Sequence, residues 1–213
     1  MSAERLASGD PAPMINDPAA TEEPWVLPST RKVGILSLIL TESALFTIFV
    51  VAYVFYMGKS LNPPYPKDVL EFPWLGTIAL LSSSFTIVAA EIMLRRSHRL
   101  GFLLCWGITI ALGAYFVYFT AFEWLHLITV KNLTIDVNVF GTTFYSLVGL
   151  HLSHVFIGLL LLSIVWLLTF FGKIPADHHE HIEMISWYWH FVDVIWIVVV
   201  TVVYIISVRV GIN

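Results

Sequence analysis

The chain has very little cysteine and few charged residues. Among its 213 residues Cys105 is the one cysteine, so no disulfide can form within the chain and no cysteine-based metal site can be built. Charged residues make up 12% of the sequence, about half the share found in a soluble domain, whereas 58% of the residues are hydrophobic. The formal net charge of −4 gives no indication of nucleic-acid binding. This composition predicts a membrane protein.

Motifs that carry chemistry in soluble enzymes are also missing. We find no glycine-rich phosphate loop, no nucleophile–base motif and no internal repeat. Residues 1–30 lack the apolar core of about 7–15 residues that a signal peptide needs. They are rich in proline, alanine and glutamate and cannot bury a core, so they predict a flexible N-terminal arm ahead of a membrane domain over residues 31–213.

Long apolar runs are what the chain does contain. A helix crosses a hydrocarbon core with about 20 mostly apolar residues, and five stretches without internal proline are long enough. A barrel would need strict alternation of apolar and polar residues, which is absent. The sequence therefore predicts an all-α, polytopic membrane protein, a five-transmembrane-helix bundle, with spans at about 33–57, 73–95, 100–127, 139–171 and 184–208.

Lysine and arginine are distributed unevenly between the two ends of these spans. With the N-terminus inside, seven basic residues lie on the inner side and four on the outer side, and the inner excess sets the orientation. We therefore predict a cytoplasmic N-terminus and an external C-terminus. The inner residues are Arg5, Arg31, Lys32, Arg95, Arg96, Arg99 and Lys173, and the outer residues are Lys59, Lys67, Lys131 and Arg209.

Ionisable side chains occur inside the predicted spans, where an uncompensated charge is costly. Glu42 lies about a third of the way into the first span, and we interpret it either as an uncharged carboxyl group bonded to a neighbouring helix or as a proton-exchanging carboxyl group. Two other pairs are three residues apart, so each pair shares a helix face. These four residues predict a polar cluster between the third and fourth helices: Glu123, His126, His151 and His154.

The same four side chains can be compared with known metal centres. Di-iron bundles take Glu-x-x-His from two helices and a further glutamate from each of two others. This sequence offers one reversed set and one His-x-x-His, so the carboxylates are too few, although chemistry alone allows a histidine to bind haem. We favour an interhelical hydrogen-bond network, with no metal and no cofactor held by this chain.

The last apolar run begins with SWYWHFVDVIW, residues 186–196. Trp187, Tyr188 and Trp189 predict an aromatic belt at the membrane interface. His190 and Asp193 share a helix face, and we expect Asp193 to accept a hydrogen bond from the imidazole. The pair predicts a buried polar contact near the inner boundary that fixes this helix against another, with direct proton transfer as the alternative.

The predicted inner loop at 172–183 is rich in histidine and acidic residues. Such tracts bind metal in some proteins. Because histidine titrates near neutral pH, we favour a solvated loop that collects protons for a neighbouring uptake pathway, through His178, His179 and His181.

Several segments, in order along the chain, resemble one family. WYWHFVDVIW resembles the signature near the C-terminus of cytochrome c oxidase subunit III. TESALFTIFVVAYVFY resembles the family's segment with a buried glutamate, here Glu42, and LEFPWLGTIALLSSSFTIVAAE resembles the start of the next helix. LGAYFVYFTAFEW and FGTTFYSLVGLHLSHVFIG resemble the helix pair that carries Glu123, His151 and His154. The resemblance covers about residues 31–208.

The resemblance implies a non-catalytic core subunit III of a respiratory haem–copper terminal oxidase, which reduces oxygen to water and pumps protons. The haem and copper would lie in partner subunits, chiefly subunit I, with subunit II and a small fourth subunit or a bc1-type supercomplex as further partners. The chain would stabilise subunit I, support proton uptake and bind phospholipid in the bacterial cytoplasmic membrane. Glu42 matches the family's carbodiimide-reactive carboxyl group, and Arg31 and Lys32 are candidates for lipid-phosphate contacts.

The sequence departs from the family in one respect. Many members have seven helices, and no counterparts of the first two are found, so a lipid cleft bordered by those helices would have to be completed by another subunit. Alternatives are subunit III of a quinol oxidase and a subunit-III-like accessory of nitric oxide reductase. A stand-alone membrane metalloprotein or proton channel built on the buried glutamate and histidine set is the alternative from another class.

Overall fold

The computed structural model describes residues 30–173 and 179–210, a helical bundle in which these residues contain no strand. Its long helices are α1 (Thr30–Tyr56), α3 (Trp74–Arg95), α4 (Arg99–Thr129), α5 (Val139–Phe170) and α6 (His179–Val200). A short helix, α2 (Pro66–Val69), lies in the connection after α1. The last span continues through a π-helical turn, η2 (Thr201–Ile206), into α7 (Ser207–Val210).

The predicted five-helix membrane bundle is confirmed. Within the described residues, five helices are long and apolar enough to cross a membrane. The last span, His181–Arg209, includes η2 and α7. Its helix begins at His179 rather than at residue 184, because the acidic and histidine-rich segment joins the helix. His190 and Asp193 therefore lie eleven and fourteen residues after the start of α6. The predicted arm, apart from Thr30, falls outside the described residues.

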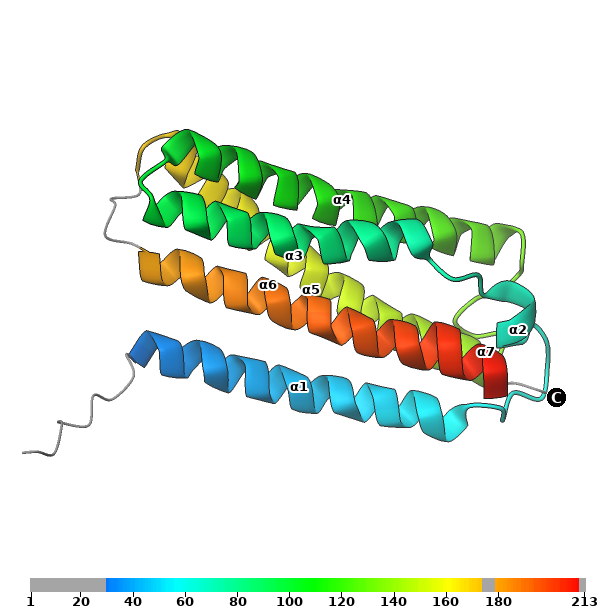
Figure 1. The fold of residues 1–213 in the computed structure, drawn as a ribbon. Coiled ribbons are helices and arrows are strands. Elements are labelled where there is room, and N and C mark those ends of the chain that lie inside the picture. Colours follow the sequence, from blue (N-terminus) through cyan, green and yellow to red (C-terminus); the bar gives the residue numbers. More distant parts are fainter. Residues whose placement is uncertain (1–29, 174–178, 211–213) are drawn as a thin grey trace, which may run out of the picture.

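Membrane-spanning helices that follow one another in the chain run antiparallel, whereas the neighbours α1 and α6 run parallel (Figure 1). α3 packs along α4, α4 packs against α5, and α6 contacts α3, α5 and α1. α1 lies at the edge of the bundle, with α5 and α6 as its main contacts, and α6 lies between α1 and α3 in the view of Figure 1. Only Phe46 and Tyr53 of α1 are buried. The first helix is thus the least integrated of the five.

Aromatic side chains fill the core, and Trp189 lies at its centre. The predicted aromatic belt is wrong for this residue and for Tyr188, because both side chains are buried. A Cβ atom at Gly113 of α4 would lie 2.7 Å from the indole ring, and one at Gly158 of α5 would lie 2.9 Å from it. The indole nitrogen donates to Ser83 Oγ of α3 at 2.8 Å. Two glycines therefore form the slot that lets one side chain of α6 contact three other helices.

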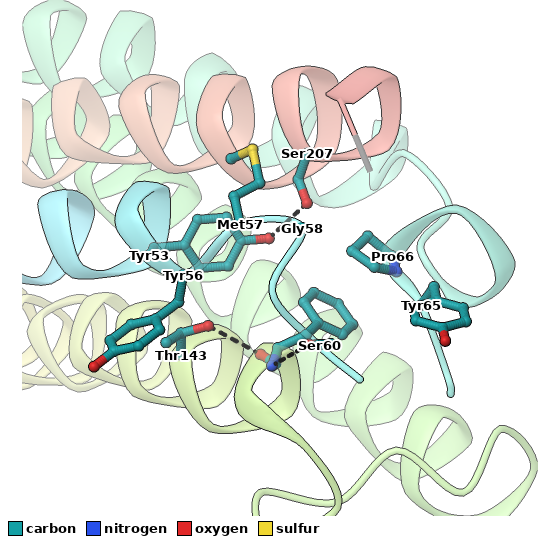
Figure 2. Close-up of a pocket in the computed structure, with 10 residues that line it drawn as sticks. Tyr53, Tyr56, Met57, Gly58, Ser60, Tyr65, Pro66, Thr143 and Ser207 are labelled. Atoms are coloured by element: carbon teal, nitrogen blue, oxygen red, sulfur yellow. Dashed lines mark hydrogen bonds between the residues drawn. The ribbon is translucent and has the colours of Figure 1, made fainter. Parts of the chain in front are cut away.

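Polar contacts fix the helix ends. Arg99, at the start of α4, donates to the carbonyl oxygens of Thr169 and Phe170 at the end of α5, at 2.6 and 3.0 Å. These are carbonyl groups that a helix leaves unpaired at its C-terminus. At the other end of the bundle, Figure 2 shows the Tyr53 hydroxyl pointing at Ser207, and it donates to Ser207 Oγ at 3.0 Å. α1 is thereby tied to α7 beside a small cavity of about 20 Å³.

Candidate functional site

Glu42 and His154 form a direct contact between α1 and α5. Glu42 Oε2 lies 3.0 Å from His154 Nε2, and His154 Nδ1 lies 2.8 Å from the carbonyl oxygen of Leu150. Because a carbonyl oxygen can only accept, Nδ1 carries a hydrogen. The remaining contact then holds one shared proton, either on the carboxyl group or on Nε2. In both arrangements the pair has no net charge, which suits its position within two membrane-spanning helices.

A cavity of about 540 Å³ surrounds this pair and opens between α1, α5 and α6. Arg31 lies at the end of the cavity nearest the start of α1, eleven residues before Glu42, which corresponds to about 16 Å along the helix. The cavity therefore has a cation at one end, a carboxyl–imidazole pair further in, and apolar walls between them. The apolar wall residues include Ile35, Leu38, Ile157, Leu161, Met184 and Ile185.

The predicted cluster of Glu123, His126, His151 and His154 is wrong as a single unit, because no two of these side chains bond to each other. Glu123 instead accepts a hydrogen bond from the Tyr204 hydroxyl of η2 at 3.3 Å. His126 is exposed near the end of α4. Residues three apart are separated by about 300° around the helix axis, so their side chains point about 60° apart. Two such side chains can therefore contact different helices.

His151 is buried among aromatic rings. Its ring stacks on Trp196 with centroids 5.0 Å apart, and Phe46 and Phe116 meet it edge-on. Neither ring nitrogen has a hydrogen-bond partner among the described residues. His151 therefore packs as an aromatic side chain here and does not belong to a polar network.

His190 and Asp193 meet through a residue of α3. Ser84 Oγ lies 3.3 Å from His190 Nδ1, and the same hydroxyl donates to Asp193 Oδ2. The predicted direct bond between the two is therefore wrong, whereas the predicted contact with another helix is present. Asp193 is 3% exposed, so its charge would be poorly solvated.

The basic and histidine-rich positions near the starts of α1 and α6 divide into two groups. Lys32 forms an ion pair with Glu183 at 3.6 Å and lies 5.7 Å from the centre of the Trp187 ring. His181 is exposed in the first turn of α6. His178 and the side chain of His179 fall outside the described residues. Among the residues the structure does describe, no three histidine, cysteine, aspartate or glutamate side chains are grouped as metal ligands would be.

The model of the family "Cytochrome c oxidase subunit III" matches residues 26–208. The chain belongs to this family. Subunit III from Thermostichus vulcanus is 36% identical over 183 residues, covering 84% of this chain and 89% of the relative. The Synechocystis subunit is 34% identical over 185 residues, covering 84% and 77%, and that of Loxodonta africana is 33% identical over 183 residues, covering 81% and 68%.

Membership of the subunit III family confirms the resemblance seen in the sequence. It makes the chain a multi-pass membrane subunit of a haem–copper oxidase, an oxidoreductase complex that contains other subunits. Glu42 and His154 join the first and fourth membrane helices of this subunit III, and Ser84 joins the second to the fifth. The alternative of a stand-alone metalloprotein or channel is not supported by this membership.

Sequence reasoning overlooked three residues that complete these contacts. Ser84 lies in the run SSS, and the sequence does not show which of these serines contacts another helix. Tyr204 lies at the end of the long apolar run VIWIVVVTVV, within the π-helical turn, and the sequence does not relate it to Glu123. Gly113 was visible only as one small residue in an apolar run. Gly158 did carry a signal, since small residues mark close helix approach.

Proposed function

We propose that the chain is a non-catalytic subunit III that stabilises the haem- and copper-bearing subunit I beside it and holds no redox centre of its own. The observation that carries the proposal is the Glu42–His154 pair, a buried carboxyl–imidazole contact that ties α1 to α5. Family membership supports the assignment to an oxidase. The other ionisable side chains within the spans, such as Asp193 and Glu123, likewise contact residues of neighbouring helices.

A metal analysis of the purified chain tests the absence of a redox centre. We expect haem and copper in the intact oxidase and neither in stoichiometric amount on the isolated subunit. A bound haem or metal retained by the subunit alone would overturn the proposal.

We further propose that the cavity beside Glu42 holds one acyl chain of a phospholipid whose phosphate lies at Arg31, with Lys32 as a second contact. The support is the order of groups along the cavity, since a cation at the membrane boundary followed by apolar walls matches a phosphate followed by an acyl chain. An Arg31→Leu variant tests this assignment. We expect the purified oxidase to lose one phospholipid per complex by mass spectrometry, whereas the exposed-residue control Arg96→Leu keeps it. Equal lipid content in both would contradict the site.

We propose a supporting role in proton uptake for the acidic and histidine-rich cytoplasmic side, through His178, His179 and His181. We also propose that the N-terminus is cytoplasmic and that the membrane is bacterial. Replacing these three histidines with alanine is expected to slow proton uptake by the oxidase while leaving its haem spectrum unchanged. Wild-type uptake kinetics in that variant would rule the role out.

Glu42→Gln separates a structural from a proton-exchanging carboxyl group. The amide can still donate to His154 Nε2, so we expect the subunit to assemble and the bundle to remain intact. We expect a modest change in the number of turnovers before inactivation or in proton uptake, measured on the purified oxidase. Loss of the whole complex on this substitution would contradict the proposal.

A further inference from the structure

The turn that joins α3 to α4 carries a group of exposed basic side chains. We call it the basic corner and define it by Arg95, Arg96, His98 and Arg99, all of which are exposed. The corner lies at the end of the bundle where α1 begins (Figure 1). It therefore places three arginines, with no acidic residue among them, on the surface of one short turn.

The positive charge of the basic corner is not neutralised by the part of the chain that the structure describes. Arg99 donates to two carbonyl oxygens at the end of α5, and these groups carry no net charge. The guanidinium groups of Arg95 and Arg96 form no hydrogen bond or ion pair with a described residue. Glu91 lies one helical turn before Arg95, but the two do not form an ion pair. The corner can thus accept an anionic partner.

The segment that precedes α1 has the opposite charge. Residues 1–29 lie outside the described residues, and their sequence contains five acidic residues and one arginine, a formal net charge of −4. This equals the formal net charge of the whole chain, so the charges of the remaining residues balance. Glu22 and Glu23 are adjacent and are the acidic residues of this segment nearest to α1. The chain therefore carries its excess negative charge on a segment joined to the same end of the bundle as the basic corner.

The distance from the start of α1 to the basic corner is short enough for this acidic pair to cross. Lys32 of α1 forms an ion pair with Glu183 of α6, and Glu183 lines a cavity of about 350 Å³ together with Arg95. Within the described bundle, α6 thus lies between the start of α1 and the corner. Packed helices are about 8–10 Å apart, so two such steps measure about 16–20 Å. Glu23 lies seven residues before Thr30, and seven extended residues span up to about 23–25 Å.

We propose that the Glu22–Glu23 pair binds the basic corner, so that the N-terminal segment crosses the start of α6 and connects α1 to α3 and α4. The occupant of the corner is this chain's own residues 1–29. The contact adds to the attachment of α1, which is the least integrated of the five long helices. The inference goes beyond the proposed function, because it concerns one chain and holds whichever partner subunits the oxidase contains.

A covalently joined segment has an advantage over other anions. Exposed ion pairs are individually weak, and salt screens them. Joining the two groups through a short flexible linker raises their effective concentration to the order of millimolar. Two adjacent carboxylates also match two adjacent arginines, whereas the phosphate diester of a lipid carries one charge. The N-terminal segment is therefore favoured over a lipid headgroup or an acidic loop of another subunit.

Photocrosslinking in the intact oxidase, in its native membrane, tests the contact. A photoreactive phenylalanine analogue replaces Thr21, next to the acidic pair, and mass spectrometry identifies the crosslinked peptides. We expect crosslinks within the chain to the turn at 95–99. The same analogue at Ile135, an exposed position in the opposite connection, should give no crosslink to this turn. Products from Thr21 on lipid, on another subunit or elsewhere in this chain, with none on the turn, would overturn the proposal.

Two double substitutions within the segment separate the position of the charges from their number. Glu22→Gln with Glu23→Gln removes the proposed contact, and we expect the crosslink yield to fall severalfold. Asp10→Asn with Asp17→Asn removes the same amount of charge farther from α1 and should leave the yield close to wild type. All four positions precede the bundle, so its packing is unchanged. Equal yields in the two double variants would contradict the assignment to the adjacent pair.

An exchange of charges provides the final comparison. Arg96→Glu is expected to lower the yield severalfold, and combining it with Glu23→Arg should restore most of it, because opposite charges again face each other. The control Lys67→Glu, at an exposed position of α2 at the other end of the bundle, should match wild type. Raising the salt concentration should lower the wild-type yield. If the exchange restores nothing, or if salt has no effect, the turn does not hold the segment by charge and the proposal fails.

Discussion

At the scale of single residues, His151 and His154 show how two identical side chains three positions apart acquire different roles. His154 reaches Glu42 on α1 and bonds to the Leu150 carbonyl oxygen, so both ring nitrogens have partners. His151 is surrounded by aromatic rings and neither of its nitrogens has a hydrogen bond within the described part of the chain. The difference follows from the rotation of α5, which directs one ring to α1 and the other to the core.

This contrast predicts opposite responses to the same substitution. His151→Phe removes two buried polar atoms and keeps an aromatic ring, so we expect the thermal unfolding temperature of the oxidase-bound subunit to stay level or rise. His154→Phe leaves the Glu42 carboxyl group without its partner, and we expect a loss of about 1–3 kcal/mol. Thermal unfolding in detergent measures both. Equal destabilisation would show that His151 also has a polar role.

Asp193 provides a second residue-level prediction. Asp193→Ala removes the acceptor of the Ser84 hydroxyl and leaves a polar group of α3 unmatched inside the bundle, at a cost of about 1–3 kcal/mol. Asp193→Asn keeps an oxygen at the same position and should retain most of the stability. Thermal unfolding and subunit retention after detergent washing report the difference. An alanine variant as stable as wild type would refute the contact between the two helices.

The sequence showed which titratable residues need a contact, but it did not show which residue each of them contacts. Glu42, His154 and Asp193 were all recognisable, because a titratable side chain in an apolar run needs a partner. Which helix supplies that partner depends on how each helix is rotated about its axis. The apolar runs contain hydrophobic residues on every side, so they leave this rotation undetermined. Glu123 was accordingly assigned to the wrong neighbours.

At the scale of helices, α6 is held by the insertion of Trp189 between α4 and α5. The indole occupies the space that side chains at Gly113 and Gly158 would fill, and its nitrogen binds Ser83. Gly149, on the same helix as Gly158, lies in a looser environment, because a Cβ atom there would be 3.4 Å from the Trp124 ring. Gly149 and Gly158 therefore differ in how closely another helix approaches them.

Alanine substitutions at these two glycines test the slot. Gly158→Ala forces the Trp189 ring to shift, and we expect a loss of about 1–3 kcal/mol from overpacking. Gly149→Ala needs no such shift, and because alanine is favoured over glycine in helices by roughly 0.5–1 kcal/mol, stability should be unchanged or slightly higher. Thermal unfolding of the two variants side by side gives the comparison. Similar losses in both would show that the slot does not control packing.

The helices themselves were predictable, and their irregularities were not. Length and hydropathy located all five spans, because the hydrocarbon thickness imposes a minimum length. The π-helical turn Thr201–Ile206 was missed, since TVVYII has the same composition as the regular helix before it. Tyr204, within this turn, donates a hydrogen bond to Glu123 of α4.

At the scale of the whole molecule, six of the ten described lysine and arginine residues lie at one end of the bundle and four at the other. Arg31, Arg95, Arg99 and Lys173 all lie at or beside the ends that α1, α3, α4 and α5 share. This distribution supports a cytoplasmic location for that end.

Labelling of introduced cysteines tests the orientation in a Cys105→Ala background. We expect Ile135→Cys, in the opposite connection, to react with a membrane-impermeant maleimide in intact spheroplasts. His98→Cys, in the basic connection, should react only after permeabilisation. Both positions are exposed in the structure. The reverse pattern would place the N-terminus outside.

The light attachment of α1 has a consequence for biogenesis. Its main contacts are with α5 and α6, which the ribosome makes last, and its buried residues are only Phe46 and Tyr53. When the first helix leaves the insertion machinery, Glu42 enters the bilayer before His154 has been synthesised. The Glu42 carboxyl group therefore lacks its imidazole partner while the second and third spans are made, until the fourth helix is inserted.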